Sequence, residues 1–211
     1  MVVLHELIQR RRINKLRLHM RHDPLRQFDR WFGQAQRARI HLAEAMAVAT
    51  ADQRGRPSVR FVLLKQGDHR GFVFFTNAGS RKGRELRANP RAAAAIHWDA
   101  LGKQVRIEGR VEKVTAAEAD AYWVTRPRAS QLGALASQQS ATLASRSDLL
   151  ARWRTLRQRY RGKPIPRPPG WTGFRIVPEA IEFWIHQNHR LHHRELFVYT
   201  RRGWTRKLLQ P

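Results

Sequence analysis

The sequence predicts a β-barrel with flanking helices, an α+β fold, from three observations. Short runs rich in β-branched and aromatic residues recur at close spacing between residues 45 and 114. Hairpin-like turns separate these runs, whereas a parallel sheet would need long crossover connections. Stretches with helical spacing of apolar residues flank the runs, and further strand-like segments close the chain.

The composition is that of a globular protein with a strong excess of positive charge. Apolar residues make up 42% of the 211 residues, and 41 Lys and Arg stand against 16 Asp and Glu, a net charge of +25. Such a charge fits an enzyme for anionic ligands or a nucleic-acid-binding protein without catalysis. The aromatic residues fall mostly at apolar strand and helix positions, which disfavours binding of nucleic acid as the main role.

Several classes of protein are disfavoured by what the chain lacks. It contains no Cys, which excludes disulfides and thiol catalysis. No apolar run approaches the roughly 18 residues of a membrane span, and residues 1–22 show no export signal. We therefore expect a cytoplasmic protein with a basic, partly mobile N-terminal arm over 1–22 and a single domain over 23–211.

The first half of the chain predicts one helix followed by strands. Asp23 is a helix cap and Pro24 suits the first helical position, so a helix is expected from there to about Ala43. Turn residues at 52–55 and 67–71 separate the next apolar runs. The predicted strands are Ala45–Thr50, Ser58–Lys65, Phe72–Thr76, Ala92–Trp98 and Gln104–Val114.

The stretch at residues 71–89 carries the first candidate site. The strand ends in a turn, and Ser80 is expected to cap a helix that Asn89 and Pro90 end. Arg81 and Lys82 then place cations at a helix start, where free N–H groups already favour an anion. The pattern fits a phosphate cradle, and a polar turn with solvated basic residues remains the alternative.

The second half predicts two more helices and the closing strands. A capping box, Thr115 to Glu118, begins a helix that runs to about Thr125 before Pro127. A second helix is expected over Ser145–Arg161, with Leu149, Leu150, Trp153 and Leu156 facing inward, and a Pro-rich loop follows it. The closing strands are predicted at Phe174–Val177, Ala180–Trp184, Glu195–Tyr199 and Trp204–Leu209.

One further anion site follows from spacing alone. Tyr122 and Arg126 stand four residues apart on the predicted helix, hence on one face, and Ser130 follows just beyond Pro127. Along the strand at 58–65, alternation places Arg60 and Lys65 on opposite faces unless a bulge intervenes.

Five segments, in this order, resemble the pyridoxamine 5'-phosphate oxidase family. The resemblance covers roughly residues 23 to 211. The segments are Arg60–Lys65 (RFVLLK), Phe75–Lys82 (FTNAGSRK), Arg126–Gln131 (RPRASQ), Ser137–Ser140 (SQQS), and Glu182–Trp184 (EFW) through Arg190–Arg194 (RLHHR).

The resemblance implies a fold, a cofactor and a reaction. The family fold is a split β-barrel that forms a homodimer, with flavin mononucleotide (FMN) bound across the interface. The implied reaction, part of vitamin B6 metabolism, oxidises pyridoxamine 5'-phosphate or pyridoxine 5'-phosphate to pyridoxal 5'-phosphate, with O2 as acceptor and H2O2 as product. A related flavin oxidase with another substrate is the alternative within the same fold.

The resemblance also assigns residues. Forked guanidinium groups and an ammonium suit a phosphate dianion, and amide side chains suit the edge of a flavin ring. The implied FMN ligands are Arg60, Phe75, Thr76, Arg81, Lys82, Gln104, Gln139, Ser140, Trp184 and Arg194. The implied substrate ligands are Lys65, Tyr122, Arg126, Ser130, Arg190 and His192.

Arg190 and His192 are also the implied catalytic pair. Two residues apart, they would share a face of an extended segment. Arg190 would orient the substrate and stabilise negative charge, and His192 would exchange a proton. The neighbouring His186, His189 and His193 invite a metal site, but no Cys or clear carboxylate set completes one, so no metal is expected.

The chain departs from the family pattern at two places. His193 stands where the family usually has Asp, so a carboxylate that would balance Arg190 or Arg194 is replaced. The family's N-terminal arm carries an Arg and a Tyr that cover the substrate, and no such pair can be placed in residues 1–22.

Overall fold

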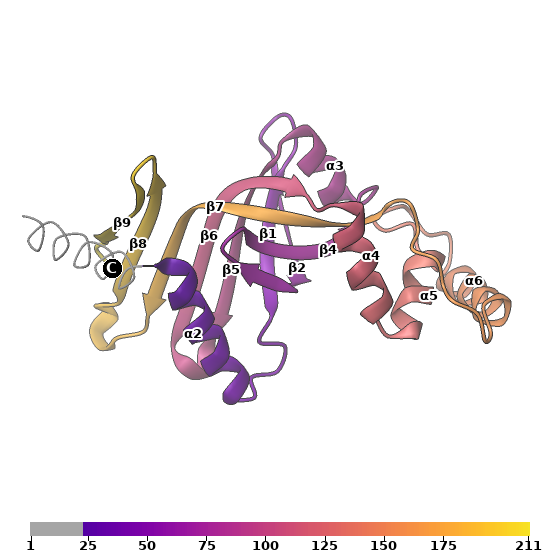
Figure 1. Cartoon of the computed structure of the whole chain (residues 1–211), viewed down its shortest axis with the longest axis horizontal. Coiled ribbons are helices and arrows are strands. Elements are labelled where there is room, and N and C mark those ends of the chain that lie inside the picture. Colours follow the sequence, from indigo (N-terminus) through magenta and orange to yellow (C-terminus); the bar gives the residue numbers. More distant parts are fainter. Residues whose placement is uncertain (1–22) are drawn as a thin grey trace, which may run out of the picture. The chain divides into compact units, whose positions relative to one another are not determined.

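The computed structural model describes residues 23–211, so the predicted basic arm lies outside the described residues (Figure 1). The helices are α2 (Pro24–Arg37), α3 (Arg81–Ala88), α4 (Ala116–Thr125), α5 (Arg128–Ala136) and α6 (Arg146–Arg159), with short turns η1 (Asp99–Leu101) and η2 (Asn188–Arg190). The strands are β1 (Ala45–Ala51), β2 (Pro57–Leu63), β3 (Gln66–Asp68), β4 (Gly71–Asn77), β5 (Arg91–Trp98), β6 (Lys103–Lys113), β7 (Trp171–Ile185), β8 (His193–Thr200) and β9 (Gly203–Leu208).

Within residues 23–211 these strands form one nine-stranded sheet with the order β2-β1-β5-β6-β7-β4-β3, and β8 joins β7 to β9. The neighbouring pairs β1–β2, β3–β4, β4–β7, β7–β8 and β8–β9 are antiparallel, as the hairpin-like turns predicted. No helix in this part of the chain has the length and apolar character that a membrane span requires.

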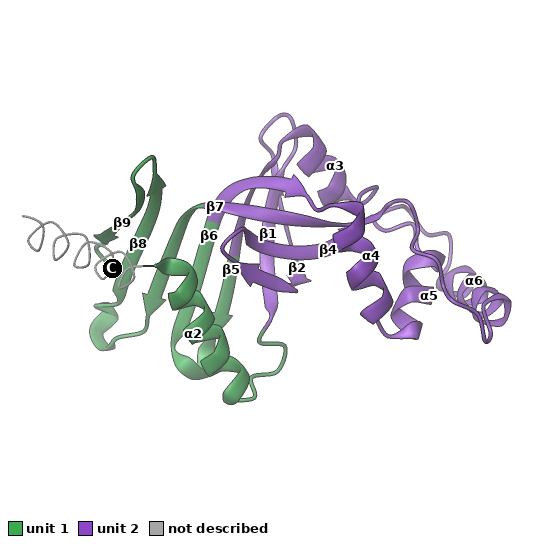
Figure 2. Cartoon of the chain, in the orientation of Figure 1, with its two compact units in different colours: residues 1–43, 95–107, 179–211 green, residues 44–94, 108–178 purple. Residues whose placement is uncertain are grey.

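The chain divides into two compact units (Figure 2), and β5, β6 and β7 each contribute residues to both. In the described part of the chain, the first unit comprises residues 23–43, 95–107 and 179–211. Its aromatic core packs α2 on the sheet: Trp31 meets Phe183 edge-on at 5.0 Å, and Phe183 meets Phe197 at 5.8 Å. The second unit, residues 44–94 and 108–178, contains α3 to α6.

Helix α2 begins as predicted and ends earlier. Asp23 caps it by accepting a hydrogen bond from the Leu25 N–H at 2.9 Å, and Pro24 takes the first position. The helix stops at Arg37 rather than near Ala43, because Arg39 and Leu42 adopt left-handed backbone angles, with φ of 52° and 51°. No glycine marks this stop in the sequence, so residue type did not signal it.

Three other local predictions were wrong. Gly67 and Asp68, expected in a turn over 67–71, belong to strand β3, which pairs with β4. Helix α5 was missed because Pro127 was taken only as the end of α4, yet it also serves as the cap that begins α5. Leu150 on α6 is 41% exposed rather than buried, and no α6 residue is fully buried.

The two strands expected at 174–177 and 180–184 are one strand, β7. Its first part, Trp171 to Ile176, pairs with β4, and Ala180 to Ile185 pairs with β8. Pro178 falls between these two stretches, where its missing N–H interrupts neither ladder.

Candidate active site

The predicted phosphate cradle is built by β4, the turn after it and α3. Ser80 caps α3, because its Oγ accepts a hydrogen bond from the Gly83 N–H at 3.3 Å. A Cβ on Gly83 would lie 2.3 Å from the Ala78 carbonyl oxygen, so only glycine lets the helix lie this close to the turn. The strand, turn and capped helix are therefore as the sequence predicted.

Lys82 points into the second unit and meets two of the predicted FMN ligands. Its side chain is buried, and Nζ donates to Thr76 Oγ1 at 3.1 Å and to Gln139 Oε1 at 3.3 Å. Thr76 Oγ1 in turn donates to Gln139 Oε1 at 2.7 Å. Burial, followed by the nearby Arg60 charge, lowers the pKa of Lys82. Ser140 follows Gln139 in a left-handed conformation, φ 70°.

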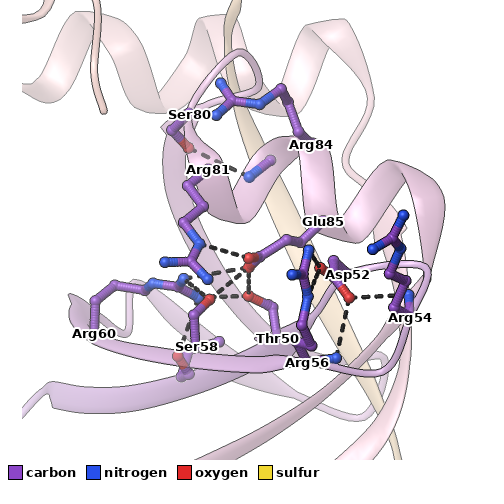
Figure 3. Close-up of polar contacts among 12 residues, drawn as sticks. Thr50, Asp52, Arg54, Arg56, Ser58, Arg60, Ser80, Arg81, Arg84 and Glu85 are labelled. Carbon is purple, nitrogen blue, oxygen red and sulfur yellow. Dashed lines mark hydrogen bonds and ion pairs between the residues drawn. The ribbon is translucent and has the colours of Figure 1, made fainter. Parts of the chain in front are cut away.

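Arg60 and Arg81 meet at a carboxylate that the sequence reasoning did not single out (Figure 3). Arg81 Nε donates to Glu85 Oε1 at 2.8 Å, and Arg60 NH2 lies 3.3 Å from Glu85 Oε2. Thr50 and Ser58 donate to the same Oε2 at 2.5 and 2.7 Å. Burial would raise the pKa of Glu85, but these hydrogen bonds outweigh it and lower the pKa to about 2. Glu85 is therefore a buried carboxylate anion.

The predicted substrate-phosphate ligands line a second cationic pocket in the same unit. Lys65, Tyr122 and Arg126 surround a cavity of about 250 Å³ that Thr76 and Lys82 also line. Ser130 lines a neighbouring cavity of about 380 Å³ together with Arg126. Lys65 lies 3.8 Å from the Glu44 carboxylate.

An aromatic stack supports Arg126. The rings of Phe75 and Tyr122 stack at 4.1 Å, and those of Phe75 and Trp171 stack at 5.2 Å. The Arg126 guanidinium lies over the Trp171 ring at 4.9 Å and over the Trp123 ring at 5.3 Å. Its NH1 is buried and has no hydrogen-bond partner among the described residues, and burial lowers the pKa of the group. A buried donor without an acceptor is typical of a ligand site.

The first unit carries the remaining predicted residues. The rings of Trp184 and His192 lie 4.5 Å apart, and those of His186 and His192 lie 5.4 Å apart. The Gln187 N–H donates to His192 Nδ1 at 3.2 Å, which leaves Nε2 of the ring for another partner. Gln104 is the second residue of β6. Among residues 23–211, no group of three or more metal-ligating side chains gathers around a common point.

Arg190 and His192 do not share an extended segment, so that prediction was wrong. Arg190 is the last residue of η2 and has a φ of 62°, and His189 before it has a φ of 57°. This left-handed stretch turns the chain between β7 and β8. Arg190 is exposed and His192 is partly buried.

His193 and Arg194 each pair with a carboxylate to which sequence reasoning gave no role. His193 Nε2 lies 3.2 Å from Glu195, which also binds Arg206 and accepts from Gln27 at 3.1 Å. Arg194 Nε instead donates to the buried Glu182 at 2.7 Å. Glu182, which also accepts from Arg106 NH1 at 2.9 Å, is thus the carboxylate that pairs with Arg194 in this structure.

Comparison with known proteins agrees with the resemblance over the length of the chain. Residues 32–160 match the family model described as pyridoxamine 5'-phosphate oxidase, and residues 171–211 match the pyridoxine 5'-phosphate oxidase C-terminal dimerisation region. The chain belongs to the pyridoxamine 5'-phosphate oxidase family. It is thus a flavin-dependent oxidoreductase by family, as the motifs predicted.

Relatives and solved structures agree with this assignment. The pyridoxine/pyridoxamine 5'-phosphate oxidases of Rubrobacter xylanophilus and Myxococcus xanthus are 52% and 53% identical, over 90% of this chain and 87% and 92% of theirs. A crystal structure of PhzG from Burkholderia lata 383 with tetrahydrophenazine-1-carboxylic acid superposes with a TM-score of 0.86 at 34% identity, covering 90% of this chain and 93% of that one. An FMN-binding, oxidase-related protein of Nostoc punctiforme, 16% identical, has the same fold at a TM-score of 0.73, covering 90% of this chain and 98% of that one. The predicted split-barrel fold is confirmed.

Proposed function

We propose that the protein oxidises pyridoxamine 5'-phosphate or pyridoxine 5'-phosphate to pyridoxal 5'-phosphate, with FMN as cofactor and O2 as acceptor, releasing H2O2. One observation carries the proposal: the cations of the second unit gather at two places, around Glu85 and beside the aromatic stack. Arg60 and Arg81 meet at Glu85, and Lys65 and Arg126 line the pocket beside the stack. Lys82 belongs to both places, because its charge interacts with Arg60 and Glu85 and its side chain lines that pocket. Two phosphate-bearing ligands, cofactor and substrate, account for both groups.

The donor set fits FMN. Within the described part of the chain, Arg81 keeps NH1 and NH2 for a ligand. Lys82 offers a buried ammonium, and Gln139 and Thr76 lie within hydrogen-bond reach of it. Capped helix α3 adds N–H groups at the same place, where the dipole favours an anion. When bound, FMN supplies the acceptor for the two electrons that leave the substrate carbon.

The protein's own residues bind and orient the substrate. Lys65, Tyr122 and Arg126 hold the substrate phosphate, and the unpartnered NH1 of Arg126 gains an acceptor when they do. Arg190 orients the pyridine ring, and Nε2 of His192 exchanges a proton, because Nδ1 already accepts from the backbone. Ser130 beside Arg126 completes the phosphate clamp.

We also infer a homodimer. Residues 171–211 match a dimerisation region. Strand β2 lies at the edge of the sheet and exposes Val59, Phe61 and Leu63, by 69%, 76% and 38%. Apolar side chains in a row on an edge strand are typical of a covered surface. Light scattering that finds a flavin-loaded monomer at micromolar concentration would refute the dimer.

A second candidate is oxidation of a carboxylated, non-phosphorylated substrate. The similarity to PhzG, crystallised with tetrahydrophenazine-1-carboxylic acid, favours this possibility. The four clamp residues predicted for a phosphate favour the first candidate. Turnover of a carboxylated tricyclic compound with none of pyridoxamine 5'-phosphate would select the second.

The proposed FMN site is tested by removing two side chains that should bind the FMN phosphate and measuring FMN affinity. The double variant Arg81→Ala/Lys82→Ala should weaken FMN binding by roughly 2–5 kcal/mol, the range for truncating partners of a buried charge. The control is Arg87→Ala/Lys113→Ala, which removes one Arg and one Lys from exposed positions of the same unit. Equal FMN affinity in the two double variants would place the phosphate elsewhere.

A further inference from the structure

We propose that Glu85 is a positioning residue for the cofactor phosphate, which holds Arg60 and Arg81 in their binding arrangement before the phosphate arrives. The proposal rests on the proposed FMN function. Glu85 lies on α3, and the groups that it binds come from β1, β2 and its own helix. Figure 3 shows these side chains converging on the Glu85 carboxylate.

The burial of Glu85 indicates that its contacts are needed. The residue is 6% exposed, and both carboxylate oxygens accept hydrogen bonds. A buried carboxylate is costly unless it is paired and hydrogen-bonded, so the charge persists here only because these donors surround it. Removing the carboxylate would leave two guanidinium groups and two hydroxyls without their common acceptor.

Glu85 helps to fix Arg60 as an immobile charge. Arg60 NH1 donates to Thr50 Oγ1 at 2.5 Å and to the Val48 carbonyl at 3.4 Å. Arg60 NH2 donates to Ser58 Oγ at 2.5 Å and to Glu85 at 3.3 Å. A guanidinium has five N–H donors, so only Nε remains for a ligand among these contacts. Arg60 therefore contributes a positive charge at a fixed position, because its NH1 and NH2 groups already bind protein acceptors.

Arg81 is held differently. Glu85 takes only its Nε, in an i,i+4 contact of 2.8 Å, and leaves the NH1 and NH2 fork for an oxyanion. The Arg81 side chain is 58% exposed, so without this contact it would sample many rotamers. Of the two guanidinium groups at Glu85, Arg81 is thus the one that keeps both NH1 and NH2 for a phosphate among the described contacts.

The charge balance agrees with this role. Arg60, Arg81 and Lys82 bring three cations together, and their mutual repulsion would drive the exposed Arg81 outward in the absence of an anion. Glu85 reduces the net charge of the group to +2, which matches a phosphate dianion.

The test is the affinity of the apoprotein for FMN and for riboflavin, which lacks the phosphate, measured by quenching of flavin fluorescence. Glu85→Ala should weaken FMN binding by roughly tenfold to a hundredfold, the scale of losing a group that orients ligands. Riboflavin affinity should change less than about twofold, since the residue acts on the phosphate only. Glu85→Gln, which keeps an acceptor oxygen, should fall between the wild type and Glu85→Ala.

The control is Asp120→Ala, which removes a carboxylate paired with Arg167 on an exposed part of the same unit and should leave both affinities unchanged. Tighter FMN binding in Glu85→Gln would overturn the proposal, because Glu85 would then compete with the phosphate. Equal weakening of FMN and riboflavin would overturn it too, since Glu85 would only support the fold. If Glu85→Ala does not fold, Glu85→Gln carries the test. A wild-type protein that binds no FMN would instead refute the proposed function.

Discussion

Replacing Arg126 with Met should weaken substrate binding while leaving the stability of the fold nearly unchanged. The buried NH1 of Arg126 has no acceptor among residues 23–211, and such a group costs roughly 1–3 kcal/mol of folding free energy. Against this, the guanidinium lies over two Trp rings at 4.9 and 5.3 Å, and such contacts contribute about 0.5–2 kcal/mol. The two effects nearly cancel, and Met keeps the apolar stem. We therefore expect the free energy of unfolding of the apoprotein to change by less than about 1 kcal/mol.

The same variant should lose most of its affinity for the substrate. Truncating one partner of a buried charge pair costs about 2–5 kcal/mol, and the KM for pyridoxamine 5'-phosphate should rise roughly thirtyfold or more at a tenfold change per 1.4 kcal/mol. Thermal unfolding and steady-state kinetics on the same preparation measure both quantities.

Arg167→Met is the matched control for that experiment. Arg167 also approaches Trp171, but it is paired, donating to the Trp171 carbonyl at 2.8 Å and to Asp120 at 2.6 Å. The control should lower stability by about 1–3 kcal/mol with little change in KM, because it leaves a carbonyl without its partner. A variant Arg126→Met that unfolds easily while keeping the wild-type KM would refute the reasoning.

Three further predictions follow from the site. His193→Asp should lower stability by up to about 1 kcal/mol and leave FMN affinity unchanged, because it places a carboxylate beside Glu195; tighter FMN binding would show that the family Asp matters here. Arg190→Ala should lower kcat/KM by about tenfold to a thousandfold with stability unchanged, since the residue is exposed, and wild-type activity would refute its role. The pKa of Glu85 falls from 4.5 to about 2 on folding, so its contribution of roughly 3 kcal/mol is present above pH 4.5 and lost as pH falls towards 2. The free energy of unfolding of Glu85→Gln should not show this loss at low pH. If the stabilities of the wild type and of Glu85→Gln fall in parallel between pH 4.5 and 2, the prediction is refuted.

The sequence predicted the elements whose signals are local. Ser80 and Thr115 cap their helices as expected, because a cap depends on a few neighbouring residues. The end of α2 depends on left-handed angles at Arg39 and Leu42 that neither residue type favours. Pro178 inside β7 is tolerated because pairing changes from β4 to β8 there, a property of the whole sheet.

The candidate site likewise combines features that local sequence signals predict with features that only the fold reveals. The motifs named the cationic residues, and the structure brings those of the second unit together around α3 and around the aromatic stack. The carboxylates that hold the cations were missed. Glu85 meets Thr50, which lies 35 residues away, and Glu182 meets Arg194 across paired strands, so only the fold reveals these contacts. The i,i+4 spacing of Arg81 and Glu85 was the one signal available in advance.

Aerobic turnover of pyridoxamine 5'-phosphate by the FMN-reconstituted protein tests the central claim most directly. Pyridoxal 5'-phosphate is followed through its aldehyde, and H2O2 is measured in the same sample. The account predicts that both products accumulate in equal amounts, and that Arg126→Met needs far more substrate to reach the same rate. A protein that holds FMN yet forms neither product from pyridoxamine or pyridoxine 5'-phosphate would contradict the account.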